Sequence, residues 1–496
     1  MIAGVPLLSG AAVDLGEVPL LTVEEFRESI LIGVRRGGRL ASFFGLPGPA
    51  GARLVAVIAR EDRGILSVLS AAVSDGYPAL TPLCPQAHLF EREIFEETGV
   101  EPRGHPWLKP VRFPPARLSG RPAVSCGAAD FFRIEGEEIH EVAVGPVHAG
   151  IIEPGHFRFQ CHGEVVHHLE ISLGYQHRGI ERALVGAPAS KTIHYLETLA
   201  GDTTVGHAMA YCRIAEALSG CRVSARAQVI RGVALELERI ANHLGDLGAL
   251  SGDVGFLPTM SYCGRIRGDV LNLTAALCGN RFGRGMMRPG GVGFDLEEKT
   301  AARLRERLAA ALRDAESAIG LLWETPSVLA RFEGTGVVTG ADAAAAGLVG
   351  LAARASGLAR DVRRDFPFGI FRMAHIPPAS AETGDVFARA FVRWLEIQRS
   401  AAFIAEQLQA LPEGPARVEG GPWAAGRLAV ALVEGWRGEI CHAAVTDDAG
   451  RFARYQAVDP SFHNWFGLAL ALRNGQISDF PLCNKSFNLS YCGFDR

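Results

Sequence analysis

Apolar side chains recur every three or four residues in several stretches of this 496-residue chain. The clearest stretch is 227–248, where the repeat comprises Ile230, Val233, Leu237, Ile240, Leu244 and Leu247. The same spacing returns at 304–322 and, less regularly, at 343–362 and 385–410. Because this period places the apolar residues on one face of a helix, it predicts several long helices that each bury one stripe. Helices of this kind with antiparallel connections form a bundle.

The N-terminal part has a different pattern. Two β-rich runs at 54–60 and 64–71 are separated by a short charged turn, which predicts a β-hairpin. The stretch 88–99 places its apolar residues largely on one side of a helix, and Gly99 is a suitable stop. These elements predict a small α/β unit.

The remaining organisation follows from two further stretches. Residues 116–140 are rich in Pro, Arg, Gly and Glu, which is typical of a linker. Alternating apolar positions at 145–159 predict a β-hairpin. The predicted fold class is therefore α+β: a small α/β domain at 1–115, the linker, and a mainly helical domain at 141–496 that opens with the hairpin.

Composition excludes several classes of function. A formal charge of −4, with no basic block, argues against nucleic acid as a partner. There is no run of about 18 apolar residues and no basic, apolar leader, so we expect membrane contact only through partner subunits. The ten cysteines are scattered and no two stand three apart, which argues against local iron-sulfur or zinc pairs. Reduced, mostly buried thiols in a cytoplasmic protein are expected.

Several motifs carry a family resemblance. HisArgGlyIleGlu at 177–181, the segments 280–291 and 383–389, and the C-terminal tail resemble the large subunits of group 4 membrane-bound nickel-iron hydrogenases and of complex I (the 49-kilodalton type). This resemblance covers about 145–496 and implies a hydrogenase-large-subunit-like fold. The GluArgGlu helix followed by Gly and a HisPro turn, within 88–110, is similar to the 30-kilodalton-type subunit of complex I.

The hydrogenase resemblance implies a metal site that this sequence lacks. In that family two CxxC pairs bind the metal, and their positions fall here on Ala200, Thr203, Ser490 and Gly493. Ala and Gly offer no donor, and a hydroxyl is too weakly acidic to replace a soft thiolate. Cys492 lies one residue from the last position, and one thiolate does not replace four. We therefore expect no metal.

Four other residues are candidate catalytic groups. Arg178 and Glu181 match the family's RGxE element, in which the resemblance implies that the glutamate relays protons; the alternative is an ion pair between the two at helical spacing. His207 is kept from the family pattern, whereas Asp202 is new to it. Asp202 either forms a proton-carrying pair with His207 or caps the following helix, and the cap is favoured.

The complex I resemblance raises the question of a quinone. The His and Tyr that the resemblance implies for binding a quinone head group fall approximately on Pro154 and Gly201, which have no side-chain proton to donate. His156, Tyr195 or Tyr211 could substitute.

Two further motifs have ordinary interpretations. Four histidines lie within 156–168, but His167 and His168 point to opposite faces of a strand, so we do not expect them to bind one metal ion. The Gly-rich stretch 284–292 lacks a phosphate-loop pattern and is expected to be a turn. Since there is no dinucleotide fingerprint, independent binding of NADH is not expected.

The resemblance implies a core peripheral-arm subunit of a membrane-associated, complex I-like or hydrogenase-related oxidoreductase, with electron transfer coupled to ion translocation and no nickel-iron site. The alternatives are a quinone-reducing subunit of the NADH-quinone oxidoreductase type and a non-catalytic assembly scaffold. No cofactor is expected in this chain, and a quinone is left open. The implied partners are an iron-sulfur-bearing small subunit and ion-translocating membrane-arm subunits, which would hold the chain on the cytoplasmic side of the inner or cell membrane.

Overall fold

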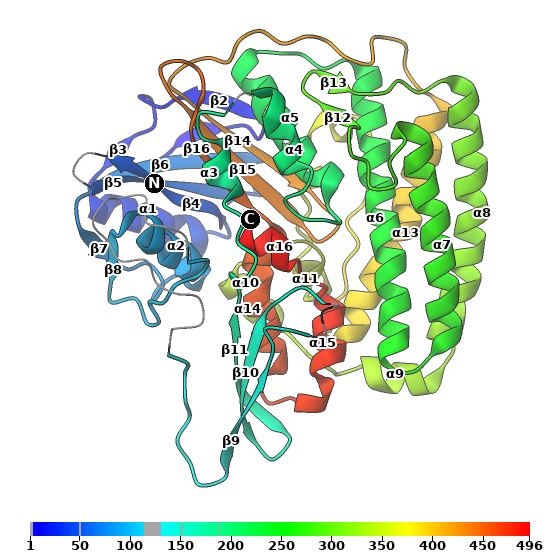
Figure 1. Cartoon of the computed structure of the whole chain (residues 1–496), viewed down its shortest axis with the longest axis horizontal. Helices are drawn as coiled ribbons and strands as arrows, with labels where there is room; N and C mark the ends of the chain where they lie inside the picture. The colour runs from blue at the N-terminus through cyan, green and yellow to red at the C-terminus, as the bar shows by residue number, and fades with distance from the viewer. Residues whose placement is uncertain (1–2, 49–50, 114–129, 149, 151, 188) are drawn as a thin grey trace.

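The computed structural model describes residues 3–48, 51–113, 130–148, 150, 152–187 and 189–496. The fold is mixed α+β, as predicted, with a sheet-containing N-terminal part beside a bundle of long helices (Figure 1). Much of the predicted linker lies outside the described residues, and its last residues enter the strand β9 (Ile139–Val144). Among the helices of the described residues, none combines the length and apolarity that crossing a bilayer requires.

The N-terminal sheet has the strand order β1-β6-β5-β4, with antiparallel neighbours. The predicted hairpin is confirmed as β5 and β6, and the short strand β3 runs parallel to β6. Helices α1 and α2 pack against this sheet, and α2 ends at Gly99, whose φ is 71°. The elements are β1 (Val5–Leu7), β3 (Leu20–Leu21), α1 (Val23–Arg35), β4 (Arg39–Gly48), β5 (Gly51–Arg60), β6 (Ile65–Val73), β7 (Gly76–Pro78), η1 (Pro85–Ala87), α2 (His88–Thr98) and β8 (Glu101–Arg103).

A second sheet joins the two ends of the chain. Its order is β16-β15-β14-β2, so the strand β2 (Ala11–Asp14) completes a sheet otherwise built from β14 (Arg427–Glu434), β15 (Glu439–Thr446) and β16 (Phe452–Val458). All neighbours are antiparallel. The sequence prediction missed this sheet and described the region only as mainly helical.

The bundle consists of four long helices that stand side by side (Figure 1): α6 (Ala225–Asp253), α7 (Leu257–Cys278), α8 (Glu298–Trp323) and α13 (Val386–Gln409). Three of them match predicted periodic stretches. The prediction for 343–362 was wrong, because this stretch is broken into α10 (Gly340–Ala346), α11 (Gly350–Ala355) and α12 (Val362–Asp365). Gly350 has a φ of +60°, and a Cβ there would lie 2.0 Å from the Cα of Gly438, so the backbone must turn at a glycine.

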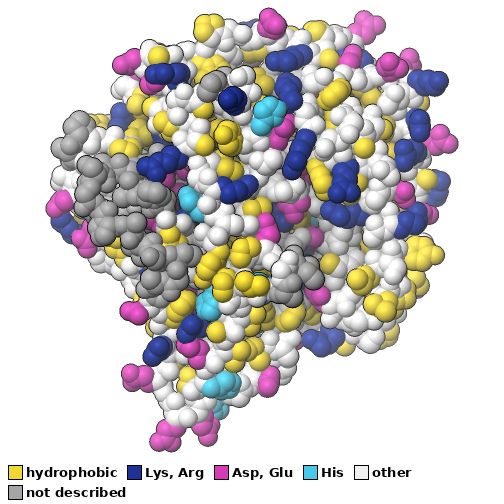
Figure 2. All heavy atoms as spheres, viewed as in Figure 1, with side chains coloured by type: hydrophobic (Ala, Val, Ile, Leu, Met, Phe, Trp, Pro, Cys, Tyr) yellow, Lys and Arg dark blue, Asp and Glu magenta, His cyan; other side chains and the backbone are white. Residues whose placement is uncertain are grey.

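The predicted β-hairpin at the start of the large domain is β10 (His156–His162) paired with β11 (Val165–Ser172), and β9 adds a third strand. This sheet protrudes from the body of the molecule (Figure 1), and acidic and histidine side chains gather at its tip (Figure 2). The C-terminal helices return to the centre of the molecule (Figure 1). The remaining elements are α3 (Ile180–Leu184), α4 (Ala189–Leu196), α5 (Thr204–Ser219), β12 (Met287–Arg288), β13 (Gly291–Val292), α9 (Pro326–Phe332), η2 (Gly369–Arg372), α14 (Pro460–Leu472), η3 (Ile477–Asp479), α15 (Phe480–Phe487) and α16 (Tyr491–Asp495).

Candidate functional site

The C-terminal tail lies against the segment 197–207. Arg178 connects the two, because its guanidinium donates to the carbonyl oxygens of Thr198 and Leu199, each at 2.7 Å, and to that of Cys492 at 3.3 Å. The backbone N–H of Arg178 also donates to the carbonyl oxygen of Arg496, at 2.8 Å. Arg178 therefore positions the backbone of both segments that hold the implied metal-ligand positions.

The four implied ligand positions do not fit a metal that needs soft donors. The Ser490 hydroxyl accepts the N–H of Gly493 at 2.9 Å and so caps α16. The Thr203 hydroxyl accepts the indole N–H of Trp436 at 3.1 Å, and Ala200 is buried with no donor. A Cβ on Gly493 would lie 2.8 Å from a carboxylate oxygen of Asp459, so a cysteine side chain would collide there.

The neighbouring thiol does not restore the ligand set. Burial raises the pKa of Cys492 to about 11, and its sulfur lies 3.4 Å from the Ser490 hydroxyl. A single thiol cannot replace the four thiolates of the family pattern.

Asp202 binds Arg437; it neither pairs with His207 nor caps α5. Its carboxylate receives two hydrogen bonds from the Arg437 guanidinium, at 2.6 and 2.7 Å. The N-cap of α5 is Thr203, so the predicted Asp202 cap is wrong, and His207 pairs with another acid. Arg437, which is buried, also donates to the carbonyl oxygen of Asn488 in the tail. This ion pair therefore links the start of α5, the β14–β15 turn and the tail.

His207 belongs to a fully buried chain of hydrogen bonds. Its Nε2 lies 2.9 Å from Oδ2 of Asp459, and its Nδ1 lies 3.1 Å from Nε2 of His442. The other nitrogen of His442 lies 2.8 Å from the Tyr455 hydroxyl. We name this set, Tyr455, His442, His207 and Asp459, the buried relay.

One assignment of protons satisfies every member of the buried relay. A neutral His207 that donates from Nε2 to Asp459 accepts at Nδ1 from His442, which in turn accepts from the Tyr455 hydroxyl. Each donor then points towards Asp459, which lies beside Gly493, one of the implied ligand positions. Such an ordered row can pass a proton by shifting each hydrogen along its bond.

The charges of the buried relay favour an ionised Asp459 beside a neutral His442. Burial alone would raise the pKa of Asp459, but the hydrogen bond from His207, with the charge of Arg437, leaves that pKa below its ordinary value. Burial holds the pKa of His442 well below its usual range.

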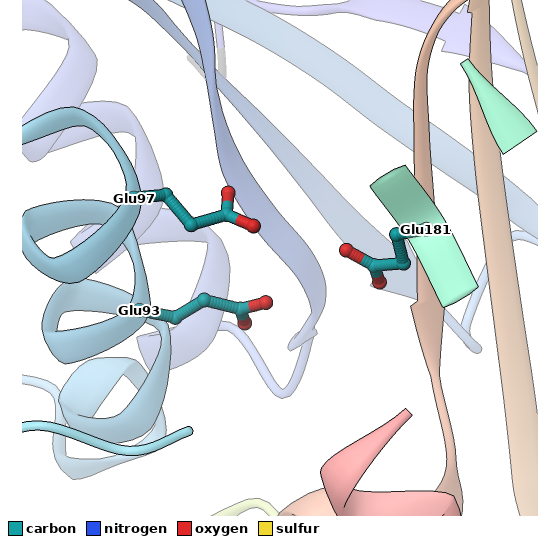
Figure 3. Close-up of side chains that lie close together, drawn as sticks. All are labelled: Glu93, Glu97 and Glu181. Atoms are coloured by element: carbon teal, nitrogen blue, oxygen red, sulfur yellow. The ribbon is translucent and has the colours of Figure 1, made fainter. Parts of the chain in front are cut away.

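Glu181 lies in a cluster of three buried carboxylates. Glu93 and Glu97 of α2 point towards Glu181 of α3 (Figure 3), and single oxygens of the three lie within 4.8 Å of one another. Three buried arginines face these acids and form ion pairs with them. They are Arg112, Arg454 and Arg496. Because three guanidinium groups balance three carboxylates, this cluster needs no metal ion.

The surroundings of Glu181 do not meet the condition for a proton relay, which is a pKa near neutrality. Burial would raise its pKa, but Arg496, Arg454 and Arg112 lower the pKa of Glu181 to about 2. The suggested Arg178–Glu181 ion pair does not form, since Arg178 donates to backbone carbonyls while Glu181 pairs with Arg454 and Arg496. Glu181 is thus an ionised anchor between the N-terminal part, the second sheet and the tail.

Glu238 of α6 has a pKa near neutrality, unlike Glu181. Its carboxylate accepts the N–H groups of Val205 at 2.6 Å and Gly206 at 3.1 Å, so it caps α5 from a neighbouring helix. Burial, with a smaller contribution from Asp202, raises the pKa of Glu238 to about 8. Sequence reasoning missed this residue, because its partners lie over thirty positions away.

The candidate groups for binding a quinone are dispersed. His156 is bonded to the carbonyl oxygen of Gly145, Tyr195 is exposed, and Tyr211 is buried in α5. The space beside Asp202 within this chain has a volume of about 10 Å³, too small for a head group.

The two minor motifs have structural roles. Within the described residues, the metal-type cluster is the glutamate trio and includes none of the four histidines of 156–168. The Gly-rich stretch 284–292 forms the short β12–β13 turn, and Gly290 donates from its backbone N–H to Glu216 at 2.8 Å.

Comparison with known proteins identifies two regions. Residues 253–426 match the family described as the 49 Kd subunit of respiratory-chain NADH dehydrogenase, and residues 53–123 match its 30 Kd subunit. The carbon monoxide-induced hydrogenase of Rhodospirillum rubrum is 32% identical over 352 residues, which cover 70% of this chain and 97% of that protein. Formate hydrogenlyase subunit 5 of Escherichia coli is 31% identical over 437 residues, covering 85% and 77%.

A third relative is a subunit of an NADH-quinone oxidoreductase. The C/D subunit of NADH-quinone oxidoreductase from Bacteroides thetaiotaomicron is 29% identical over 413 residues, which cover 73% of this chain and 74% of that protein. The resemblance inferred from the motifs is confirmed. The chain belongs to the family of large subunits that includes the carbon monoxide-induced hydrogenase, formate hydrogenlyase subunit 5 and the 49 Kd subunit of respiratory-chain NADH dehydrogenase. It carries a 30 Kd-type region ahead of the large-subunit region.

Proposed function

We propose that this chain is the core peripheral-arm subunit of a membrane-associated oxidoreductase complex that couples electron transfer to ion translocation without a nickel-iron site. The observation that carries the proposal is that other residues stand at the four cysteine positions of the family's metal pocket. The scaffold is kept, but the four ligand positions offer no thiolate, and Arg437 pairs with Asp202 beside them. Arg437 also donates to the Thr203 hydroxyl at 3.3 Å, so one of the four positions is held in a hydrogen-bonded network with an ion pair.

In this proposal the chain itself binds no redox cofactor. Electrons pass through an iron-sulfur cluster in a small partner subunit, and ion-translocating membrane subunits complete the complex on the cytoplasmic side of the membrane. The names of the relatives support this arrangement, since they describe subunits of formate hydrogenlyase and of NADH-quinone oxidoreductase. The regions 1–115 and 141–496 correspond to the two subunit types.

The buried relay gives this chain a chemical role in coupling. A charge that appears near the tail changes the proton affinity of Asp459 by Coulomb interaction, which is strong in a buried setting. When that affinity rises, a proton is drawn along the ordered row from Tyr455 through His442 and His207 to Asp459, and Tyr455 takes a replacement proton from outside the row. Arg178, Glu181 and Asp202 hold the surrounding segments in place.

Purification of the intact complex tests the proposal. The chain, tagged and extracted from its native membrane in mild detergent, is expected to bring with it an iron-sulfur small subunit and an antiporter-like membrane subunit. Mass spectrometry identifies the partners. Recovery of the chain with soluble proteins only would contradict the proposed coupling to ion translocation.

A further inference from the structure

A separate cavity of about 510 Å³ lies between the end of α5, the start of α6 and η2. The loop at Ser9 and Gly10 closes one side, and Phe368, Ile370 and Phe371 line another. None of the four residues of the buried relay lines it. Its volume is in the range of sites that bind small organic molecules, which is about 300–1,000 Å³.

The charged residues that line this cavity are strongly unbalanced. Four arginines face one glutamate, Glu216. Glu216 is already bonded to Arg231, at 2.5 and 3.2 Å, and it also accepts the N–H of Gly290. The other three arginines, Arg213, Arg222 and Arg372, therefore have no carboxylate partner within the described residues.

Arg213 is the most informative of the three, because its side chain is buried. Its guanidinium donates only to two carbonyl oxygens, those of Leu432 and Ser9, and it lies over the ring of Phe368 at 4.6 Å. Burial, with repulsion from Arg372 and Arg231, outweighs the attraction of Glu216 and lowers the pKa of Arg213 to about 9. A buried cation without a directly bonded counter-ion is costly, and a bound anion would remove that cost.

The backbone is shaped to admit this arginine. Gly10 has a φ of +82°, and a Cβ there would lie 2.5 Å from Nη2 of Arg213. A side chain at position 10 would therefore push the guanidinium away from its place in the cavity wall. The glycine meets both requirements, the left-handed backbone and the close approach.

We propose that this cavity binds a phosphate-bearing small molecule. Guanidinium groups match phosphate oxygens with paired hydrogen bonds, and an excess of three positive charges suits a polyanion better than a single carboxylate. The cavity is larger than inorganic phosphate requires, so an organic phosphate or diphosphate fits it. Arg213 forms the fixed part of the site, and the exposed Arg222 and Arg372 guide the anion in. This site goes beyond the proposed function and does not depend on it.

Calorimetric titration of the full chain with inorganic pyrophosphate tests the proposal. Binding is expected to be saturable, to weaken as salt is raised, and to fall about tenfold in each of Arg222→Gln and Arg372→Gln, since one charge-assisted hydrogen bond is lost in each. Both arginines are exposed, so these variants should fold normally. Arg303→Gln, an exposed arginine of α8 outside the cavity, is the matched control and should bind like the natural protein.

A second arm distinguishes a soluble phosphate from a lipid headgroup. Flotation with phosphatidylglycerol vesicles is compared with flotation on phosphatidylcholine vesicles. Binding to the anionic vesicles alone that requires Arg222 and Arg372 would support the same site with a lipid as its source. The proposal is overturned if neither probe binds, or if all variants bind equally.

Discussion

Asp459 shows how one side chain can have two separable roles. Its Oδ1 accepts the N–H of Ser461 at 2.8 Å and caps α14, while its Oδ2 receives His207. The Asp-Pro pair at 459–460 predicts a helix start. It cannot predict the partner, because His207 lies 252 positions earlier in the chain. The sequence therefore identified His207 as a candidate but not the acid that binds it.

Replacing Asp459 with Asn should keep the cap and remove the charge. We expect Asp459→Asn to lower the free energy of unfolding by about 3 kcal/mol, because the buried N–H of His207 loses the charged carboxylate that accepts it. Urea denaturation followed by circular dichroism measures this. Asp342→Asn, at an exposed carboxylate of α10, should change stability by less than about 0.5 kcal/mol. Equal effects of the two substitutions would show that the buried charge is unimportant.

Glu238 should make stability depend on pH in an unusual direction. Its folded pKa of about 8 lies above its ordinary value of 4.5, so the folded state binds the proton more tightly than the unfolded state. Stability from this group is therefore full below pH 4.5 and is lost as pH rises towards 8. In Glu238→Gln the loss between about pH 5 and about pH 8 should be smaller, as measured by thermal unfolding. If Glu238→Gln and the exposed control Glu306→Gln both give the natural pH profile, the raised pKa is wrong.

At the scale of elements, the helices were more predictable than the sheets. The stretch 227–248 has a clean period and became part of α6, whereas 343–362 has a blurred one and is broken at glycines. The second sheet was missed although 428–434 and 439–446 are apolar runs around a short turn. Its edge strand β2 comes from the other end of the chain, and pairing at such separation leaves no local signal.

The Asp202–Arg437 ion pair belongs to this scale, because it joins α5 to the β14–β15 turn. A double-mutant cycle with Asp202→Asn and Arg437→Gln should give a coupling energy of about 1–3 kcal/mol, since the residues form two direct hydrogen bonds. The exposed pair Arg265 and Asp314 provides the matched cycle, expected below about 1 kcal/mol. A coupling near zero for Asp202 and Arg437 would mean that the pair does not join these elements.

At the scale of the whole molecule, buried charges join the N-terminal sheet and its helix α2 to the second sheet. Arg39 of β4 binds Glu439 of β15, and Arg454 of β16 binds Glu97 of α2 at 2.8 Å. Family motifs predicted the resemblance to both subunit types, and they predict that the four metal-ligand positions carry no thiolate. They could not predict the partners of Asp202 and His207, because Arg437 and Asp459 lie outside the motifs that carry the resemblance.

Nickel content tests the central claim most directly. The claim is that this chain keeps the shell of a metal pocket whose ligand positions, Ala200, Thr203, Ser490 and Gly493, cannot bind the metal. The intact complex is purified from cells supplied with nickel, and inductively coupled plasma mass spectrometry gives nickel per mole of this chain. We predict far less than one nickel per chain. A value near one, retained after dialysis against a chelator, would contradict the account.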